Sequence, residues 1–489
     1  MSKITIPIHA GWTPDLTPED TLKAGGLQVC NNIMPVNKYY EPVKDKLEYN
    51  SSALTGTVLN GIYAQGTDGQ YYNFAGTSTK LYRFTRSTLT DVTRASGGDY
   101  TSTFWNFAEY GSWLIATDYN DAVQVIKGFD SANFQALGGT PPKAKFCVIN
   151  NTHLVLGFVN DGTEYPKKLV WSARENAEDF TASLITGAGS QNLPDIIGNI
   201  TGLGNFGENF VIASENSVSI AYFTGTKTTF DFQINAVKNI GCFYPQSFIS
   251  IGSAVFFWGK DSIYMFNGQI KDIGENLRNS VLGGINIQYS NRITVTHNKD
   301  KKLIIWAYPT TSSTGSPDRL LFYNYAENRW SYATLTVDSI FMGAIGGIFI
   351  DDLTTTLIDD CNVLIDSNYW LNNNIVPIVG DTDSKLKTLD GSNLTSEFQS
   401  GEFVSEPSVL TTTKAYVPIE SLTGSGTITV KHRKTTIDGY TDSSAFSIKS
   451  DGRADMRATN RRLALNLSAS GFARMGNEIE AEGVEVAKR

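Results

Sequence analysis

Short apolar runs bounded by turn residues recur along this chain and leave little room for helices. They stand at 61–64, 70–74, 114–117, 154–157, 210–213, 255–258 and 303–306. Their length and their flanking residues are typical of β-strands. No helix-length amphipathic segment separates them, which excludes the strand–helix units of a parallel sheet. Two short helices are expected, at 18–24 and 173–179. The sequence therefore predicts an all-β fold with less than about 10% helix.

The runs repeat with a period close to that of propeller blades. The units begin near Leu59, Phe104, Phe146, Thr201, Gln246, Arg292 and Ile340, with spacings of 45, 42, 55, 45, 46 and 48 residues. Four-stranded propeller blades repeat at about 40–50 residues. The sequence thus predicts a β-propeller of about seven antiparallel four-stranded blades over residues 59–390. A pair of β-sandwiches is the alternative fold.

The segment before the repeats is predicted to fasten the ring of blades. Residues 1–58 are rich in proline and turn residues and are interpreted as an N-terminal arm. The last repeat, near 340–371, is short of a strand and has apolar runs at 346–350 and 362–365. Because something must join the last blade to the first, we expect a strand from 27–50 to pair into the last blade.

Residues 391–489 are predicted to form a C-terminal β-sandwich-like domain. Alternating patterns mark its expected strands at 426–433, 445–448, 462–467 and 478–486. The last of these alternates strictly, which predicts one buried face. The polar stretch 381–394 before the domain is interpreted as a linker.

The charge of the chain is unevenly distributed. The formal net charge is −9, and all of it lies in residues 1–390, which hold 37 acidic and 28 basic residues. Residues 391–489 hold 12 of each. An acidic body argues against tight binding to nucleic acid, because such binding requires basic surface. It is compatible with a channel through which DNA passes without adhering.

The cysteines and the N-terminus predict a reducing compartment. Cys30, Cys147, Cys242 and Cys361 lie far apart and form no CxxC pair, which indicates buried free thiols. The N-terminal residues lack the apolar run of a signal peptide, and no stretch reaches the ~18 apolar residues of a membrane helix. We therefore expect a soluble protein made in a cytoplasm, without a membrane span.

No complete catalytic constellation is found in the sequence. The four histidines are His9, His153, His297 and His432, and none has metal-ligand spacing with another. The GxGxxG string at 202–207 lacks a following helix and is interpreted as a turn. The acid pairs at 351–352 and 359–360 are interpreted as solvated loop acids, since adjacent strand residues face opposite ways. The sequence thus predicts no enzymatic activity, no cofactor and no metal.

Two further groups of residues have structural interpretations. Residues 320–330 resemble the edge of one kelch-type blade, with a double glycine at 346–347, and Tyr323 and Trp330 are expected to pack between blades. Basic residues gather in the predicted C-terminal domain: Lys431, Arg433, Lys434, Arg453, Arg457, Arg461 and Arg462. A solvated strand face explains this basic set, and contact with another subunit or with DNA is the alternative.

Aromatic and glycine motifs follow one another in a recognisable order. They are QVCNNIMP at 28–35, YEPV at 40–43, WNFAEYG at 105–111, LGGTPP at 137–142, VWS at 170–172, FFW at 256–258 and YNYAENRWS at 323–331. In this order the chain resembles, over about 30–420, the hub, nozzle or packaged-DNA stabilisation proteins of short-tailed bacteriophages and prophages.

The resemblance implies a structural protein of the virion. It implies a propeller body that assembles as a homohexameric ring below the portal and adaptor proteins and supports fibres or tailspikes. The ring would surround the DNA channel, and DNA would pass without sequence-specific binding. The family has no catalytic residues to carry over, and the match fades in the last 70 residues. A carbohydrate-binding or carbohydrate-degrading propeller and a host-surface adhesin are the competing hypotheses.

Overall fold

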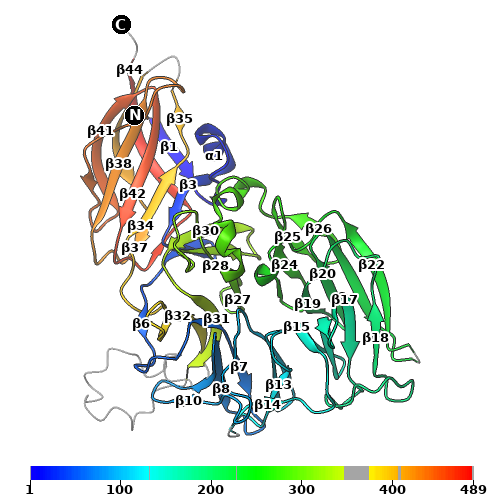
Figure 1. Cartoon of the computed structure of the whole chain (residues 1–489). Coiled ribbons are helices and arrows are strands. Elements are labelled where there is room, and N and C mark those ends of the chain that lie inside the picture. Colours follow the sequence, from blue (N-terminus) through cyan, green and yellow to red (C-terminus); the bar gives the residue numbers. More distant parts are fainter. Residues whose placement is uncertain (1, 131–132, 227, 346–373, 406–408, 487–489) are drawn as a thin grey trace.

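The computed structural model describes residues 2–130, 133–226, 228–345, 374–405 and 409–486. The chain is all-β, with 52% of its residues in strands and 5% in helices, so the predicted all-β class and low helix content are confirmed. Figure 1 shows an array of small sheets, coloured blue to yellow, beside a second group of strands that includes the orange and red C-terminal part.

The array is made of antiparallel four-stranded units, and the first six of them are meanders. Sheet one contains β7 (Val58–Gln65), β8 (Tyr71–Thr77), β9 (Leu81–Phe84) and β10 (Leu89–Asp91). Sheet two contains β11 (Asn106–Tyr110), β12 (Trp113–Thr117), β13 (Gln124–Lys127) and β14 (Gln135–Ala136). Sheet three contains β15 (Lys143–Asn150), β16 (His153–Asn160), β17 (Glu164–Trp171) and β18 (Gly189–Asn192). Sheet four contains β19 (Ile200–Phe206), β20 (Asn209–Ser214), β21 (Ser217–Phe223) and β22 (Phe230–Lys238).

Three further sheets continue the series. Sheet five contains β23 (Ile249–Ser250), β24 (Val255–Trp258), β25 (Ile263–Phe266) and β26 (Ile270–Asp272). Sheet six begins with β27 (Thr294–Asn298), β28 (Leu303–Tyr308), β29 (Arg319–Asn324) and β30 (Arg329–Thr334). Sheet seven contains β31 (Ser339–Ile345), β32 (Asn374–Gly380), β33 (Leu386–Thr388) and β6 (Leu47–Glu48). Short 3-10 helices lie at Pro245–Ser247, Glu275–Leu277, Leu282–Gly284 and Ile287–Arg292.

The apolar runs of the sequence fall on these strands. The five runs from 114–117 onward each form the second strand of a sheet, whereas 61–64 and 70–74 belong to β7 and β8. The expected starts of the seven units lie within three residues of the first strands, β7, β11, β15, β19, β23, β27 and β31. We call these first strands the inner strands. Each inner strand contacts the next one along the chain, and β31 also contacts β7.

Sheet seven contains a strand from the N-terminal segment. In β6, Leu47 pairs with Thr388 and Glu48 pairs with Lys387 of β33, in antiparallel register. The predicted pairing of a strand from 27–50 with the last unit is thereby confirmed. Lys46, next to this strand, forms a 2.6 Å ion pair with the buried carboxylate of Asp381.

A bidentate hydrogen bond joins sheet seven to sheet one. The Asn73 amide nitrogen donates to the Ala344 carbonyl at 2.7 Å, and the Ala344 N–H donates to the Asn73 Oδ1 at 2.7 Å. Nearby, the Phe341 ring occupies the space that a Cβ on Gly61 would need, since that atom would lie 2.5 Å from the ring. The first and last sheets are therefore joined by a buried amide and by close packing, and β6 adds to sheet seven the part of the chain that leads into sheet one.

Replacing Asn73 with alanine is expected to lower the free energy of unfolding by about 2–4 kcal/mol, because both backbone groups of Ala344 lose their buried partner. Urea unfolding measures the change. Asn60→Ala is the matched control: its half-buried amide donates to the Trp105 carbonyl at 3.0 Å and accepts the N–H of the adjacent Gly61 at 2.9 Å. Because these groups are only partly buried, a smaller cost of about 1 kcal/mol is expected. Equal stability of Asn73→Ala and the unaltered protein would show that this bond does not hold the two sheets together.

The C-terminal residues form two further sheets that include N-terminal strands. One has the order β1 (Ser2–Pro7), β44 (Glu478–Val486), β36 (Val409–Tyr416) and β41 (Arg453–Asn460). The other is built from β34 (Ser396–Ser400), β35 (Phe403–Val404), β42 (Arg462–Ala469), β38 (Gly426–Arg433), β39 (Thr441–Asp442) and β40 (Phe446–Ser447). A small sheet of β37 (Ile419–Glu420), β43 (Arg474–Met475), β5 (Tyr39–Pro42) and β4 (Ile33–Val36) lies beside them.

Sheet six continues into the C-terminal sheets. Two N-terminal strands, β2 (Gly11–Trp12) and β3 (Gly26–Asn31), stand between β30 and β34 and make one twelve-stranded sheet. Asn31 of β3 pairs with Tyr332 on one side and with Glu397 on the other. The N-terminal segment thus connects the array to the C-terminal sheets by backbone hydrogen bonds.

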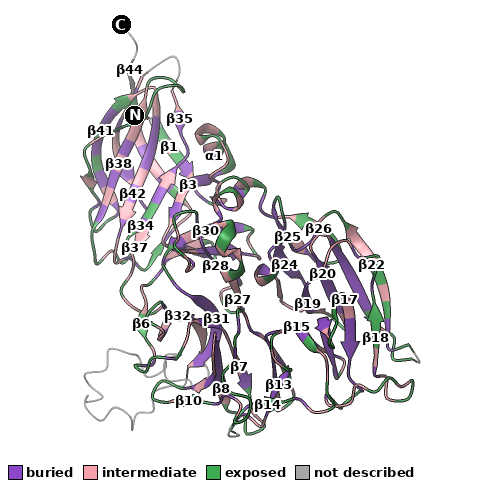
Figure 2. Cartoon of the chain, in the orientation of Figure 1, coloured by how far each residue is buried: buried purple, intermediate pink, exposed green. Residues whose placement is uncertain are grey.

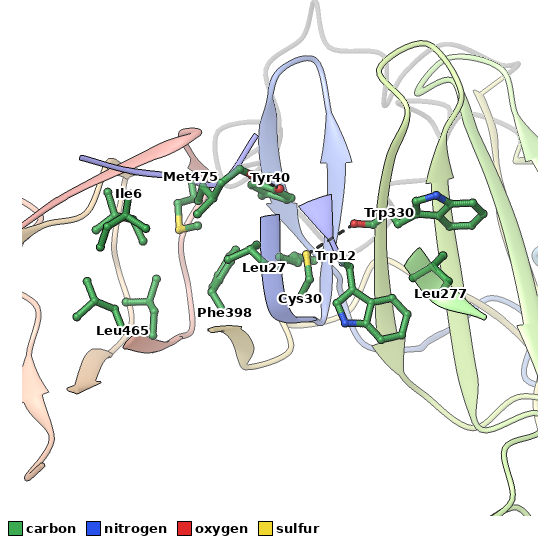
Figure 3. Close-up of a cluster of buried hydrophobic side chains, with 14 of the residues drawn as sticks. Ile6, Trp12, Leu27, Cys30, Tyr40, Leu277, Trp330, Phe398, Leu465 and Met475 are labelled. Carbon is green, nitrogen blue, oxygen red and sulfur yellow. Dashed lines mark hydrogen bonds between the residues drawn. The ribbon is translucent and has the colours of Figure 1, made fainter. Parts of the chain in front are cut away.

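One large apolar core crosses the same junction. Figure 3 shows Trp12, Leu27, Cys30 and Tyr40 of the N-terminal segment among buried side chains from both parts. The neighbours drawn there include Trp330 and Leu277 of the array and Phe398, Leu465, Met475 and Ile6 of the C-terminal sheets. Figure 2 shows buried residues running along the strands of both parts. Because interiors are close-packed, a shared core makes the two parts move together.

Helix α1 (Pro18–Ala24) has the bounds that the sequence predicts. Thr17 caps it by accepting the Asp20 N–H at 3.2 Å, and Pro18 occupies the first turn, where its missing N–H costs nothing. Gly25 ends it in the left-handed conformation, with φ of 70°.

Three expectations need correction or fall outside the described residues. Residues 173–179 form turns and not a helix, because Glu175 has φ of 59° and its N–H bonds to the Thr152 carbonyl. The stretch 381–394 is not only a linker, since β33 lies within it. The apolar runs at 346–350 and 362–365, the double glycine at 346–347, the acid pairs at 351–352 and 359–360, and Cys361 lie outside the described residues.

Candidate functional site: the cavity between the inner strands

The inner strands of all seven sheets line one cavity. Its wider part has a volume of about 610 Å³ and is bounded by residues 60–63, 106–109, 147–149, 203–205, 248–252, 295–296 and 341–342. A narrower part, of about 110 Å³, continues toward the N-terminal ends of the same strands. Ligand sites in proteins are commonly concave, largely apolar and of about 300–1,000 Å³, so the wider part is the candidate site.

The narrow part is lined by aromatic rings and by an ion pair. Phe104, Phe146 and Phe248 line it. Arg292 Nη2 lies 3.1 Å from Asp338 Oδ1, which also accepts the Ser316 hydroxyl at 2.6 Å.

Glycines of the GxGxxG string shape the wall beside Phe248. Gly202 and Gly204 lie in β19, and a Cβ on either would meet the Phe248 ring within 3.0 Å. The interpretation of 202–207 as a turn is therefore wrong for residues 202–206, which form a strand, and only Gly207 begins the turn, with φ of 61°. The glycines allow sheets four and five to approach each other, and no helix follows to bind a phosphate.

Polar side chains near the inner strands connect neighbouring sheets. Asn106 Oδ1 accepts the Cys147 N–H at 2.8 Å, and Ile340 N–H donates to Thr294 Oγ1 at 3.1 Å. Asn150 donates to Asn205 and to the carbonyls of 208 and 209. Sequence reasoning missed these side chains, because their partners lie in other sheets and no local pattern marks them.

The wide part of the cavity has one carboxylate, Glu109, among its described lining residues, and these include no lysine, arginine or histidine. Glu109 Oε1 accepts the Gln65 N–H at 3.3 Å. Burial raises the pKa of Glu109 above its ordinary value, and the Gln65 hydrogen bond opposes the shift only in part. Tyr63 also lines the cavity, and its ring centroid lies 5.8 Å from that of Tyr71.

Two residues of the predicted basic set are held inside the C-terminal sheets. Arg433 contacts both oxygens of Glu402, at 2.6 and 2.9 Å, and Arg462 contacts one of them at 3.1 Å. Glu402 is 1% exposed. Burial alone would raise the pKa of Glu402, but the hydrogen bonds from Arg433 and Arg462 outweigh it and lower that pKa. These two arginines therefore neutralise an internal carboxylate.

The other members of the basic set are more open. Lys431 lies 3.3 Å from Asp442, and Arg453 lies 3.2 Å from Asp455. Lys434 and Arg457 are exposed, and Arg461 is half-buried. The structure thus divides the set into an internal pair and a surface group that spans β38 and β41.

The remaining candidates have structural roles. Tyr323 and Trp330 are buried and stacked, with ring centroids 4.3 Å apart, as expected. Cys30, Cys147 and Cys242 are buried free thiols, as expected, and burial raises the pKa of Cys242 to about 12. No group of three or more His, Cys, Asp or Glu residues within the described ranges could hold a metal ion. No helix in the described part of the chain is long and apolar enough to cross a membrane.

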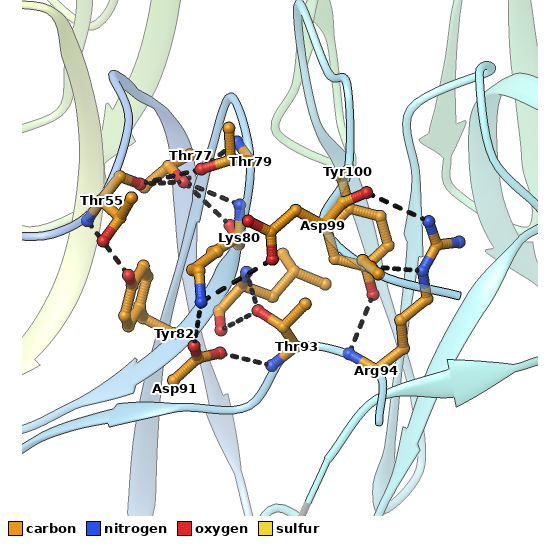
Figure 4. A network of polar contacts seen from close by, with 12 residues as sticks. Thr55, Thr77, Thr79, Lys80, Tyr82, Asp91, Thr93, Arg94, Asp99 and Tyr100 are labelled. Atoms are coloured by element: carbon orange, nitrogen blue, oxygen red, sulfur yellow. Dashed lines mark hydrogen bonds and ion pairs between the residues drawn. The ribbon is translucent and has the colours of Figure 1, made fainter. Parts of the chain in front are cut away.

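A second polar cluster lies between sheets one and two and is drawn in Figure 4. Lys80 lies 2.7 Å from Asp91, Thr93 N–H donates to Asp91 at 2.9 Å, and Thr55 N–H donates to the Tyr82 hydroxyl at 3.0 Å. Its donors and acceptors bond to one another, and they fasten the segments on either side of sheet one. We therefore interpret this cluster as structural: its contacts hold sheet one to the segments that precede and follow it.

The solved structures that resemble this chain share little of its sequence. No family model matches the chain, and no curated protein matches it. Among solved structures, the computationally designed Ika8 protein has a TM-score of 0.39 at 7% identity, covering 73% of this chain and 95% of that one. The extracellular domain of the BT4673 hybrid two-component system from B. thetaiotaomicron has a TM-score of 0.40 at 9% identity, covering 85% of this chain and 47% of that one.

Proposed function

We propose that the chain is a structural component of a bacteriophage tail, a hub or nozzle subunit that forms a homohexameric ring around the DNA channel. In this proposal the seven four-stranded sheets are the blades of a β-propeller, and β6 fastens the last blade. The C-terminal sheets form a sandwich-like domain. The portal and adaptor lie above the ring, and fibres or tailspikes attach to it.

The observation that carries the proposal is the continuous junction through the N-terminal segment. Residues 28–43, which include the first motifs of the phage-tail resemblance, form β3, β4 and β5. These strands contribute buried side chains to the core shared by the array and the C-terminal sheets. A ring subunit must transmit force without bending, and a shared sheet and core suit that requirement.

The DNA path of the proposed ring runs between subunits and not through the propeller. The narrow part of the cavity, about 110 Å³, has no room for a nucleic acid strand. Closed rings use heterologous contacts, in which one face of a subunit meets a different face of its neighbour. The acidic body would repel phosphate and let DNA slide. Exposed Lys434 and Arg457 are then candidates for contact with a neighbouring subunit.

Electron microscopy of the purified protein tests the proposal. Sixfold rings are expected, with light scattering giving a mass close to six times 53.5 kDa. A protein that stays monomeric at all concentrations and also fails to join purified portal and adaptor proteins would overturn the proposal. A matched assay on polysaccharides and phosphoesters should give no turnover above background.

A carbohydrate-active propeller is the alternative function. Glycoside hydrolysis usually requires two carboxylates on either side of the bond, and the described lining of the cavity supplies one, Glu109. Turnover of a polysaccharide that is lost on changing one carboxylate would favour this alternative.

A further inference from the structure

The outermost strand of sheet four has an edge that differs from the edges of the other sheets. Strand β22 has nine residues, whereas the outer strands β10, β14, β18, β26 and β6 have two to four. The outer strand of sheet six, β30, is paired with β2 and β3. Natural proteins keep exposed edge strands short, because such edges pair with other chains. Figure 1 shows β22 on the side of the array away from the C-terminal sheets.

We propose that β22 is a docking surface for a second copy of this chain, in which residues 230–234 of the two copies pair as antiparallel strands about a twofold axis at Phe232. Sheet four would then continue into sheet four of the partner. Such a contact is isologous, because both copies use the same surface. The contacts within the proposed ring are heterologous, so this inference goes beyond the proposed function and does not depend on it.

Hydrogen bonds to β21 show which peptide groups of β22 face outward. The Thr224 N–H donates to the Thr229 carbonyl at 3.1 Å, and the Asn235 N–H donates to Ser219 Oγ at 2.9 Å. Positions 229 and 235 therefore face β21. Because peptide groups alternate in direction along a strand, the even positions within 230–234 face away from β21. Among the described residues, β22 has no second strand partner for these groups.

A bulge limits the proposed pairing to the first half of β22. Residues 230–233 pair with residues 220–223 of β21 in unbroken register, and the register shifts beyond them. Asn235 lies at this irregularity and has φ of 52°, which bends the strand. The regular part before the bulge is the part that can accept another strand. Each outward position there can exchange two backbone hydrogen bonds with an antiparallel partner.

Charge selects one register for the contact. With Phe232 on the axis, Asp231 of one copy lies opposite the partner's Gln233, and this pair occurs twice. Both side chains are exposed, and the Gln233 amide can donate to a carboxylate across the strands. Moving the axis to residue 231 would place two Asp231 carboxylates opposite each other, which is unfavourable. The sequence of this edge is therefore complementary to itself.

Apolar side chains lie beside the same edge. Phe232 and Ile234 are half-buried and pack against the core between sheets three and four. The Phe232 ring centroid lies 6.3 Å from that of Trp171. A second strand would cover the part of these side chains that is still in contact with water, which is favourable. Because the strand contact is small, the dimer is expected to be weak and to depend on concentration.

Disulfide trapping tests the register. The opposed positions 231 and 233 would form a pair without mutual backbone hydrogen bonds, with Cα atoms about 4.5 Å apart, a distance that a disulfide can span. Mild oxidation of an equimolar mixture of Asp231→Cys and Gln233→Cys is expected to give linked dimers on a non-reducing gel. Either variant alone should give few. A mixture of Ser190→Cys and Asn192→Cys, exposed positions with the same spacing on β18, is the matched control.

Sedimentation velocity over a wide range of concentration tests the charge pairing. Gln233→Asp places two carboxylates opposite each other at both ends of the contact, and it should weaken the dimer several-fold. Adding Asp231→Lys to this variant makes the opposed charges attractive and should restore the dimer. Gln191→Asp, the same change at an exposed position of β18, should leave it unaltered. Melting temperatures of these surface variants should match that of the unaltered protein.

The proposal fails if the cysteine mixture gives no more linked dimer than either variant alone, or if Gln233→Asp and Gln191→Asp associate equally. Either result would mean that Asp231, which accepts the Phe232 N–H at 2.9 Å, and the bulge at Asn235 keep this edge unpaired. Rings of the proposed kind should associate in pairs at high concentration and separate into single rings in Gln233→Asp. A failure here therefore leaves the ring itself to be decided by microscopy.

Discussion

A protein lacking residues 1–50 is expected to be insoluble, or to melt many degrees below the unaltered protein. The deletion removes β1 from β44, β2 and β3 from between β30 and β34, and β6 from β33. Each loss leaves an unpaired strand edge, and exposed edges are templates for aggregation. Expression followed by sedimentation and a thermal melt measures the effect. A truncated protein that stays soluble and equally stable would mean that residues 1–50 serve as an arm for a neighbouring subunit.

A single substitution separates the closing strand from the rest of the segment. Leu47→Pro distorts β6 and removes a backbone donor beside β33, and it should lower the melting temperature clearly. Thr90→Pro in β10, the last strand of sheet one, is the matched control because it alters a short outer strand that comes from within its own repeat. If both variants melt alike, β6 has no special role in joining the first and last sheets.

Replacing Glu402 with alanine is expected to destabilise the protein by about 3–5 kcal/mol, because Arg433 loses its buried counter-charge and Arg462 loses the nearer of its two carboxylates, the other being Glu19 at 3.6 Å. Tyr440 also loses a hydrogen bond, which it donates to Glu402 Oε1 at 3.2 Å. Unfolding in urea, followed by tryptophan fluorescence, measures the loss.

Variants of the same network show whether charge is the cause. Glu402→Gln keeps the shape and should cost less than alanine, since its amide oxygen can still accept hydrogen bonds. Arg457→Ala, at an exposed position of β41, is the control and should change stability by no more than about 0.5 kcal/mol. If Glu402→Ala and Arg457→Ala cost the same, the arginines find other partners and the network is not a structural centre.

Local patterns predicted the strands of the array well. The run at 303–306 is apolar and bounded by turn residues, and it lies in fully buried β28. Helix 18–24 had a cap and a terminal glycine, and its bounds were right. Residues 173–179 had a helical composition, but contacts with distant residues such as Thr152 fixed them as turns.

Pairing between distant segments was harder to predict. The role of a strand from 27–50 followed from a count of strands in the last unit. The insertion of β2 and β3 between β30 and β34, and the pairing of β1 with β44, left no local signal, because register depends on partners hundreds of residues away.

The candidate site could be predicted only in part. A central cavity follows from the propeller hypothesis, but which side chains line it, Glu109 among them, depends on the residues that each inner strand turns toward it. The basic residues of the C-terminal part were found, yet the sequence could not show that Arg433 and Arg462 are paired internally, since Glu402 lies about 30 and 60 positions away.

The pairing of β1 with β44 determines the order in which the parts of the chain can fold during synthesis. Pro7 is 471 positions ahead of its partner Glu478, and a ribosome adding about 5–20 residues each second needs roughly 25–95 s to cover that distance. Throughout this interval β1 has no partner strand, while sheets one to five can fold as local meanders. The C-terminal sheets are thus completed last, and a chaperone that shields residues 2–31 during translation should raise the yield of folded protein.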